Sequence, residues 1–266
     1  MKITRMRINH LKNPLGFRLS NTMFSWVVEE SRGRRAVASR IVVSSGGATV
    51  IDTGWEQLDS LAANVGVPLQ PCTRYEWTVS VRTDAGEEVA SPVATFETGK
   101  MDEPWSAQWI VCEGADSPRH PVFSHLIELS GEVASARLYA CGLGFYDASI
   151  NGERVGDEYL APGTNAYDRW LQVQTYDVTE QLQAAGEKAE LSFLMGNGWW
   201  KGRFGFIPED RGFYGNDWRL IAELHVTYAD GSEQVFGTGE GWTMTRSNIT
   251  GSNIYDGMYV DDTLPA

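Results

Sequence analysis

Short segments in which apolar and polar residues alternate make up most of this sequence, and glycine, aspartate or asparagine punctuates them. A period of two places apolar side chains on one face of a β-strand, whereas a helix repeats about every 3.6 residues. Helical periodicity is confined to residues 55–65 and 179–187, where we expect a turn or two of helix each. Many short strands separated by turn residues indicate β-sandwiches, so the predicted fold class is all-β.

Residues 1–100 carry the first strand pattern. One run within them alternates most clearly and is expected to place four side chains on a single buried face: Tyr75, Trp77, Val79 and Val81. A turn at residues 84–86 follows this run. The other strands are expected at residues 24–28 (with Trp26 in the core), 40–43, 50–55 and 94–98.

The stretch LQPCTRYEWTVSVRTDAGEEVASPVATFETG resembles the tyrosine corner and final hairpin of a fibronectin type III domain. In such a corner a tyrosine hydroxyl, here that of Tyr75, bonds back to the chain upstream and locks the strand crossover. The resemblance implies a fibronectin type III-like sandwich over residues 1–100. Because such domains commonly act as spacers, and fold alone does not give function, we expect a structural role.

A short polar segment, residues 100–104, marks a domain boundary. Strands are expected beyond it at residues 134–140 and 145–150, and the second ends at Asn151-Gly152, a strong hairpin signal. A strand, an Asn-Gly turn and then a Val-Gly step are typical of the galactose-binding-like jelly rolls attached to glycosidases. Residues 105–266 are therefore predicted to form a jelly-roll sandwich.

Three segments of the second domain carry a more specific resemblance. They are GFYDASINGERVGDEYLAPGTNAYDRWLQVQTYDVTEQL, LMGNGWWKGRFGF and NIYDGMYVDD. In this order, between about residues 105 and 262, they resemble the N-terminal region of bacterial α-L-rhamnosidases of glycoside hydrolase family 78. One departure is Met258, which stands where the family usually has glutamate, so no carboxylate role is expected at that position.

The resemblance implies a non-catalytic portion of an enzyme that hydrolyses terminal α-L-rhamnose from glycosides. The implied partners are L-rhamnose-containing glycosides and a C-terminal (α/α)6 catalytic barrel, which we expect to be missing from this sequence. An accessory substrate-binding or structural role is then left for these residues. The alternative is a structural β-sandwich that supports another glycosidase, such as a β-galactosidase-like enzyme, without a ligand of its own.

Glycoside hydrolysis needs two carboxyl groups that face one sugar, about 5 Å apart in retaining enzymes and about 6.5–9.5 Å apart in inverting ones. The candidate pairs are Glu209-Asp210, Asp157-Glu158, and Asp256 with Asp261-Asp262. All of them lie in polar or glycine-rich segments, where acidic residues are ordinary turn formers. We therefore assign no catalytic residue to this chain.

Some jelly rolls of the resembled family bind rhamnose through a calcium ion, so the resemblance implies calcium as a candidate cofactor. Calcium takes roughly six to eight oxygen ligands, and the loops offer them at Asn165, Asp168, Asn216 and Asp217. Sugar binding is expected at five residues, of which the aromatic ones supply a stacking platform: Asn165, Tyr167, Asn197, Trp199 and Trp200. The competing interpretation is that these residues turn the chain and fill the core.

A third interpretation assigns the aromatic residues of this region to an interface with the missing barrel, because large apolar patches usually have a partner. The residues in question are Trp200, Phe204, Phe206 and Phe213.

The net charge of −13 and the pI near 4.8 oppose binding to phosphate backbones, so nucleic acid is not expected as a partner. No apolar run has transmembrane length, and the basic N-terminus lacks the apolar stretch of a signal peptide, so no membrane partner is expected. Cys72, Cys112 and Cys141 lack metal-ligand spacing and are expected to be buried free thiols. Together these features predict a cytoplasmic location.

Overall fold

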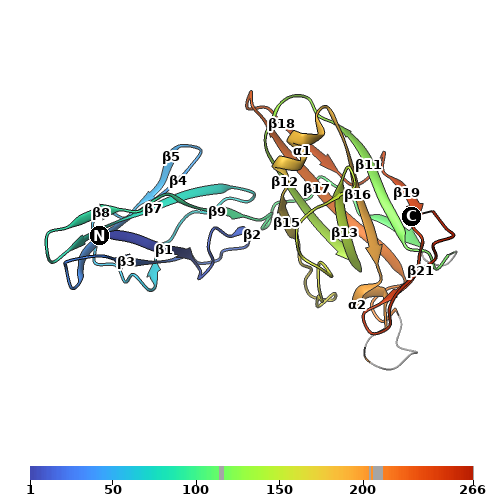
Figure 1. The fold of residues 1–266 in the computed structure, drawn as a ribbon, viewed down its shortest axis with the longest axis horizontal. Helices are drawn as coiled ribbons and strands as arrows, with labels where there is room; N and C mark the ends of the chain where they lie inside the picture. The colour runs from blue at the N-terminus through green and yellow to red at the C-terminus, as the bar shows by residue number, and fades with distance from the viewer. Residues whose placement is uncertain (114–116, 204, 206–211, 266) are drawn as a thin grey trace. The chain divides into compact units, whose positions relative to one another are not determined.

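The computed structural model describes residues 1–113, 117–203, 205 and 212–265. The chain divides into two compact units, Met1–Pro104 and Trp105–Ala266 (Figure 1). Both units are built from β-strands, which confirms the predicted all-β class. The described residues contain no helix that is long and apolar enough to cross a membrane.

The first unit consists of two sheets. One has the order β1-β3-β6, with β1 (Lys2–Ile8), β3 (Met23–Glu29) and β6 (Ala63–Asn64). The other has the order β2-β9-β7-β4-β5, with β2 (Leu15–Phe17), β9 (Ala94–Thr98), β7 (Arg74–Thr83), β4 (Ala36–Ser45) and β5 (Ala48–Asp52), and β8 (Glu88–Ala90) also pairs with β7. The neighbours are antiparallel except β2 and β9, which are parallel.

Alternation along β7 builds the core of the first unit as predicted. Tyr75, Trp77, Val79 and Val81 are all buried, and they meet Trp26 of the opposite sheet in one hydrophobic cluster. The tyrosine corner is also present, because the backbone N–H of Gln70 donates a hydrogen bond to the hydroxyl oxygen of Tyr75 at 2.7 Å. This bond fixes the segment that leads into β7.

The helix expected at residues 55–65 is wrong. The backbone of Glu56 instead exchanges two hydrogen bonds with Ser39 of β4, and the carbonyl of Ser60 accepts a hydrogen bond from the N–H of Trp26. Pairing with existing strands therefore outweighs the weak local preference for a helix. The strand expected at residues 50–55 ends earlier, at Asp52, whose carboxylate accepts a hydrogen bond from the N–H of Gly54 and turns the chain.

The second unit also has two main sheets. The first has the order β10-β17-β12-β15, with β10 (Ile110–Glu113), β17 (Asp217–Tyr228), β12 (Val133–Leu143) and β15 (Gln174–Asp177), and β18 (Glu233–Gly237) pairs with β17. The second has the order β14-β13-β16-β11-β19, with β14 (Glu153–Arg154), β13 (Phe145–Ile150), β16 (Lys188–Gly196), β11 (Pro121–Glu128) and β19 (Thr243–Arg246). A separate hairpin joins β20 (Ile249–Asn253) to β21 (Gly257–Val260).

The core of the second unit lies between these two sheets. Leu191 and Phe193 of β16 face Leu138 of β12 and Leu224 of β17 in one cluster of buried side chains. Strands β13 and β14 are joined at Asn151-Gly152, where both residues have positive φ, as a two-residue hairpin of the predicted kind requires. The jelly-roll connectivity itself stays a prediction.

Two short helices close opposite ends of the second unit (Figure 1). Helix α1 (Thr179–Ala185) confirms the helical turns expected at residues 179–187, and its Leu182 is buried in the core. Helix α2 (Gly198–Lys201) directly follows β16.

The thiols of Cys112 and Cys141 are buried and form no disulfide, as predicted, and burial raises the pKa of Cys141 to about 12. Cys72 also forms no disulfide, but the expected burial is wrong for it: Cys72 is half-buried, because it lies in the turn before β7 rather than in a strand.

Replacing Tyr75 by Phe should lower the free energy of unfolding by about 1–2 kcal/mol, because the Gln70 N–H loses its acceptor in a partly buried place. Urea unfolding followed by tryptophan fluorescence measures this loss. Tyr159→Phe is the matched control, since the Tyr159 side chain is highly exposed. An equal loss in the two variants would contradict the assigned role of the corner.

Candidate functional site

Three of the five predicted sugar-binding residues directly follow the end of β16: Asn197, Trp199 and Trp200. Asn197 separates β16 from α2, and α2 carries the two tryptophans. The Trp199 ring packs edge-on against Phe145, the first residue of β13, at 5.4 Å between centroids. The Trp200 ring instead contacts Tyr167, in the loop before β15, at 5.2 Å. The two rings therefore serve different contacts and do not form one common platform.

Tyr167, Trp200 and Tyr214 form an aromatic cluster, with the Tyr167 ring 4.9 Å from that of Tyr214. Trp200 is held in place because its Nε1–H donates to the backbone carbonyl of Asp217 at 3.1 Å. The hydroxyl of Tyr167 is buried without a hydrogen-bond partner, and burial raises the pKa of Tyr167 to about 12. These rings mainly cover one another, while Phe213 beside them is 66% exposed.

Three of the four residues predicted to hold calcium have protein partners in this structure. Asn165 is buried, and its side-chain oxygen already accepts the N–H of Gln172. The Asp168 carboxylate is exposed and pairs with Arg169 at 3.3 Å, and Asn216 is exposed. Arg219 bonds Asp217 and lowers the pKa of its carboxyl group. The described residues also contain no group of three or more His, Cys, Asp or Glu side chains arranged for a metal, so the calcium site stays a prediction.

A cavity of about 410 Å³ lies between α2 and the β20–β21 hairpin, and we call it the polar cavity. Its described lining consists mostly of polar residues: Asn197, Arg203, Gly251, Ser252, Asn253, Asp256 and Tyr259. The side chain of Asn197 ties the two elements together by donating from Nδ2 to the carbonyl of Ser252 at 2.8 Å. Of the predicted residues, only Asn197 lies here.

Arg203 is the buried charge of the polar cavity. Its Nη2 donates to Oδ1 of Asp256 at 2.5 Å, and its guanidinium lies 5.1 Å from the centre of the Tyr255 ring. Two buried side-chain atoms of the lining have no hydrogen-bond partner: Nε of Arg203 and Oδ1 of Asn197. Sequence reasoning placed neither Arg203 nor Tyr259 in a binding site, although both stand in segments that carry the family resemblance.

A second cavity, of about 360 Å³, lies on the other side of the hairpin and has mainly apolar walls, including Phe145, Leu194 and Met258. We call it the apolar cavity. Nδ1–H of its buried His120 donates to the Met195 carbonyl at 2.8 Å, and burial lowers the pKa of this imidazole. Because a carbonyl can only accept, the proton of this hydrogen bond lies on Nδ1.

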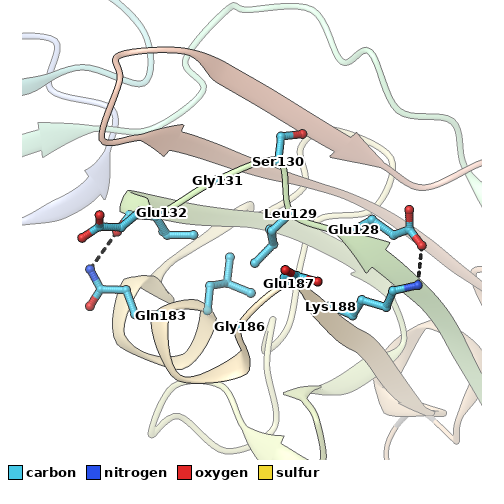
Figure 2. A pocket seen from close by; sticks show the side chains of 11 residues that line it. Glu128, Leu129, Ser130, Gly131, Glu132, Gln183, Gly186, Glu187 and Lys188 are labelled. Carbon is cyan, nitrogen blue, oxygen red and sulfur yellow. Dashed lines mark hydrogen bonds and ion pairs between the residues drawn. The ribbon is translucent and has the colours of Figure 1, made fainter.

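A third hollow, of about 690 Å³, lies at the α1 end of the second unit (Figure 2). Three of its polar side chains already have partners within the protein. Figure 2 shows Lys188 reaching Glu128, at 2.6 Å, and the Gln183 amide donates to the carbonyl of Val133 at 2.8 Å. We therefore place the candidate site at the polar cavity and not here.

The carboxylates that the sequence offered as possible catalytic pairs have the following surroundings in the described residues. Asp256 is the one carboxylate in the described lining of the polar cavity, and it is paired with Arg203. Asp261 accepts hydrogen bonds from the N–H and the hydroxyl of Thr263, a turn-forming role. Glu209, Asp210, Phe204 and Phe206 lie outside the described residues.

The position of Asn197 depends on a close approach of two backbones. A Cβ on Gly144 would lie 2.3 Å from the carbonyl oxygen of Gly196, and Gly144 has a φ of +104°. Only glycine allows both the contact and the backbone conformation. The turn between β12 and β13 therefore supports the end of β16 directly.

Both units match the profiles of known protein families. A profile described as "Alpha-L-rhamnosidase N-terminal domain" matches residues 131–265, about half of the chain. The chain belongs to this family. A second profile, "Rha78A-like, N-terminal immunoglobulin domain", matches residues 3–102. The order of the two matches confirms the predicted resemblance to the N-terminal region of α-L-rhamnosidases.

The curated relatives are much longer than this chain. Two α-L-rhamnosidases of Formosa agariphila are 29% identical over 299 residues and 30% identical over 276 residues. These alignments cover 95% and 94% of this rhamnosidase N-terminal chain but only 30% and 29% of the relatives. The chain thus spans less than a third of the length of the curated relatives it matches.

Solved structures show the same relationship. An α-L-rhamnosidase from Dictyoglumus thermophilum superposes with a TM-score of 0.85 at 27% identity, over 100% of this chain and 32% of that one. The native enzyme from Aspergillus terreus gives a TM-score of 0.87 at 27% identity, over 99% and 32%. An enzyme from Streptomyces avermitilis, complexed with L-rhamnose, shares the fold at 20% identity and a TM-score of 0.87, over 98% and 42%.

Replacing Gly144 by Ala should destabilise the rhamnosidase N-terminal chain more than replacing Gly163 by Ala. Both glycines have positive φ, so both variants carry backbone strain of about 1–2 kcal/mol. No atom lies within 4 Å of a Cβ on Gly163, whereas the Gly144 variant must also relieve the contact with Gly196, at about 1–3 kcal/mol more. Urea midpoints give the difference, and equal losses would contradict the proposed support of β16.

Acid should destabilise the second unit through His120. Because burial holds the pKa of this imidazole below its ordinary 6.5, the unfolded chain takes up the proton first as the pH falls. The stabilising contribution of neutral His120 is therefore present above about pH 6.5 and is lost below it. Urea unfolding at a series of pH values should show this slope in wild type and in His10→Asn, whose His10 is exposed, and a weaker slope in His120→Asn.

Proposed function

We propose that this chain is the non-catalytic, N-terminal portion of an α-L-rhamnosidase, and that its second unit assists the enzyme by binding substrate. The observation that carries the proposal is the match of both units, in order, to profiles of N-terminal rhamnosidase domains, while the relatives extend over more than three times this length. The proposed substrates are L-rhamnose-containing glycosides. The proposed partner is the catalytic (α/α)6 barrel that the remaining part of such an enzyme supplies.

The assignment as non-catalytic is supported by the chemistry of the polar cavity. Hydrolysis of a glycosidic bond requires one carboxyl group as the acid and a second as the base or nucleophile. The described lining offers Asp256 alone, and the carboxylate of Asp256 is already paired with the guanidinium of Arg203. A binding role needs no such pair.

A supporting role has its own observation in its favour. Strand β21 is exposed along its whole length, and its apolar residues Met258, Tyr259 and Val260 pair only with β20 in the described structure. Exposed apolar groups of this kind mark surfaces that contact a partner. The second candidate function is therefore structural: the hairpin packs on the rest of the enzyme, and the chain holds no ligand.

A titration separates the two candidates. We expect L-rhamnose to change the tryptophan fluorescence of the chain at millimolar concentrations, because Trp199 and Trp200 follow within three residues of Asn197, which lines the polar cavity. The response should be equal with calcium and with a chelator. No response in either solution would leave only the structural role, and release of the aryl group from an aryl α-L-rhamnoside would contradict the non-catalytic assignment.

A further inference from the structure

We infer that the polar cavity binds a neutral saccharide through two adjacent hydroxyl groups, with Tyr259 as its aromatic wall and Arg203, Asp256 and Asn197 as its polar contacts. The inference rests on the proposed function for the choice of a sugar, and it goes beyond that function by naming the site and the charge state of the ligand. None of the three residues Arg203, Asp256 and Tyr259 was expected at a sugar site from the sequence.

The cavity offers both kinds of hydrogen-bonding group to one ligand. Arg203 supplies donors, and its Nε–H has no partner in the structure. Asn197 and Asp256 supply acceptors, and Oδ1 of Asn197 is likewise without a partner. A sugar hydroxyl can donate and accept at once, so two neighbouring hydroxyls can satisfy a donor and an acceptor in the same place. A buried polar atom without a partner is destabilising, and a ligand hydroxyl removes that cost.

The charges of the cavity favour a neutral ligand. Arg203 is the cation of the described lining and Asp256 is the anion, and the two are bonded at 2.5 Å. Because their charges cancel locally, a carboxylate or phosphate ligand has no net attraction to the site and must compete with Asp256 for the guanidinium. A neutral polyol needs only hydrogen bonds.

The hairpin places one aromatic ring on the polar side. Successive residues of a strand point to opposite faces, and Tyr259 lines the polar cavity while its neighbour Met258 lines the apolar cavity. Both side chains are 61% exposed, so Tyr259 contributes little to the core and its ring is open to a ligand. An aromatic ring packs well against an apolar C–H face, as a pyranose presents.

This alternation supplies a matched pair of variants. Tyr259→Ala removes the ring from the polar cavity, and Met258→Ala removes an equally exposed side chain from the other face of the same strand. Titration calorimetry with L-rhamnose should show a loss of affinity of about tenfold or more in Tyr259→Ala and less than about twofold in Met258→Ala. Because both residues are exposed, both variants should fold as wild type does.

A second variant tests the charge argument by changing the preferred ligand. Asp256→Asn keeps the shape of the side chain but leaves the charge of Arg203 uncompensated. We expect this variant to bind L-rhamnose about tenfold more weakly and to acquire binding of D-glucuronate, which wild type should not bind. A variant that gains no affinity for the acidic sugar would contradict the assigned role of the ion pair.

The titrations are run with L-rhamnose, D-galactose and D-glucose. The set of sugars distinguishes an error in the proposed site from an error in the proposed function. Binding of L-rhamnose that is insensitive to Tyr259→Ala and Asp256→Asn overturns the site and leaves the proposed function. Binding of another neutral sugar that both variants weaken, without binding of L-rhamnose, supports the site and overturns the rhamnose assignment. If none of the sugars binds, the cavity holds only water and the inference is wrong.

Discussion

The contact between the backbones of Gly144 and Gly196 is the constraint on which the candidate site depends. It joins the turn after β12 to the last residue of β16, and a side chain at position 144 would occupy the space of the Gly196 carbonyl. Asn197 and α2 follow immediately, so their position is fixed from the core outward. Two hydrogen bonds from Asn197 to Ser252 then fix the position of the β20–β21 hairpin relative to the end of β16.

The hairpin in turn separates two environments. On one side the walls are apolar and His120 is kept neutral by burial. On the other side lies the ion pair of Arg203 and Asp256, beside polar atoms that the fold leaves without partners. Each such atom costs about 1–3 kcal/mol when it is desolvated and unpaired. A locally unsatisfied arrangement inside a well-packed sandwich is typical of a functional site, because the rest of the structure tolerates its cost.

Sequence reasoning succeeded where local rules decide the structure. Alternation fixes the buried face of β7, and the backbone freedom of Asn151-Gly152 fixes the β13–β14 turn. It failed at residues 55–65, because backbone pairing of Glu56 with Ser39 is a tertiary effect that local periodicity does not contain. The ring contacts of the aromatic residues were not predicted, since a contact such as that of Tyr167 with Trp200 joins segments far apart in the sequence.

The polar cavity shows the same limit. Arg203 and Asp256 are 53 positions apart, and nothing in their spacing indicates that they meet. The shared family resemblance of their two segments was the only available signal, and it named a family without naming a contact. Asn197 was predicted because it stands in a turn motif beside two tryptophans, a local pattern. The sequence therefore pointed to one residue of the proposed site, and the other residues became visible only in the fold.

The central claim is that the second unit holds a sugar at the polar cavity. The most direct test is a titration of the isotope-labelled chain with L-rhamnose, followed by ¹H–¹⁵N correlation spectra. The account predicts that the amide shifts change at Asn197, at residues 251–253 and at residues 256–259, all at or next to the cavity lining. Shifts that gather instead at the Tyr167–Trp200 cluster, or an unchanged spectrum at saturating sugar, would contradict it.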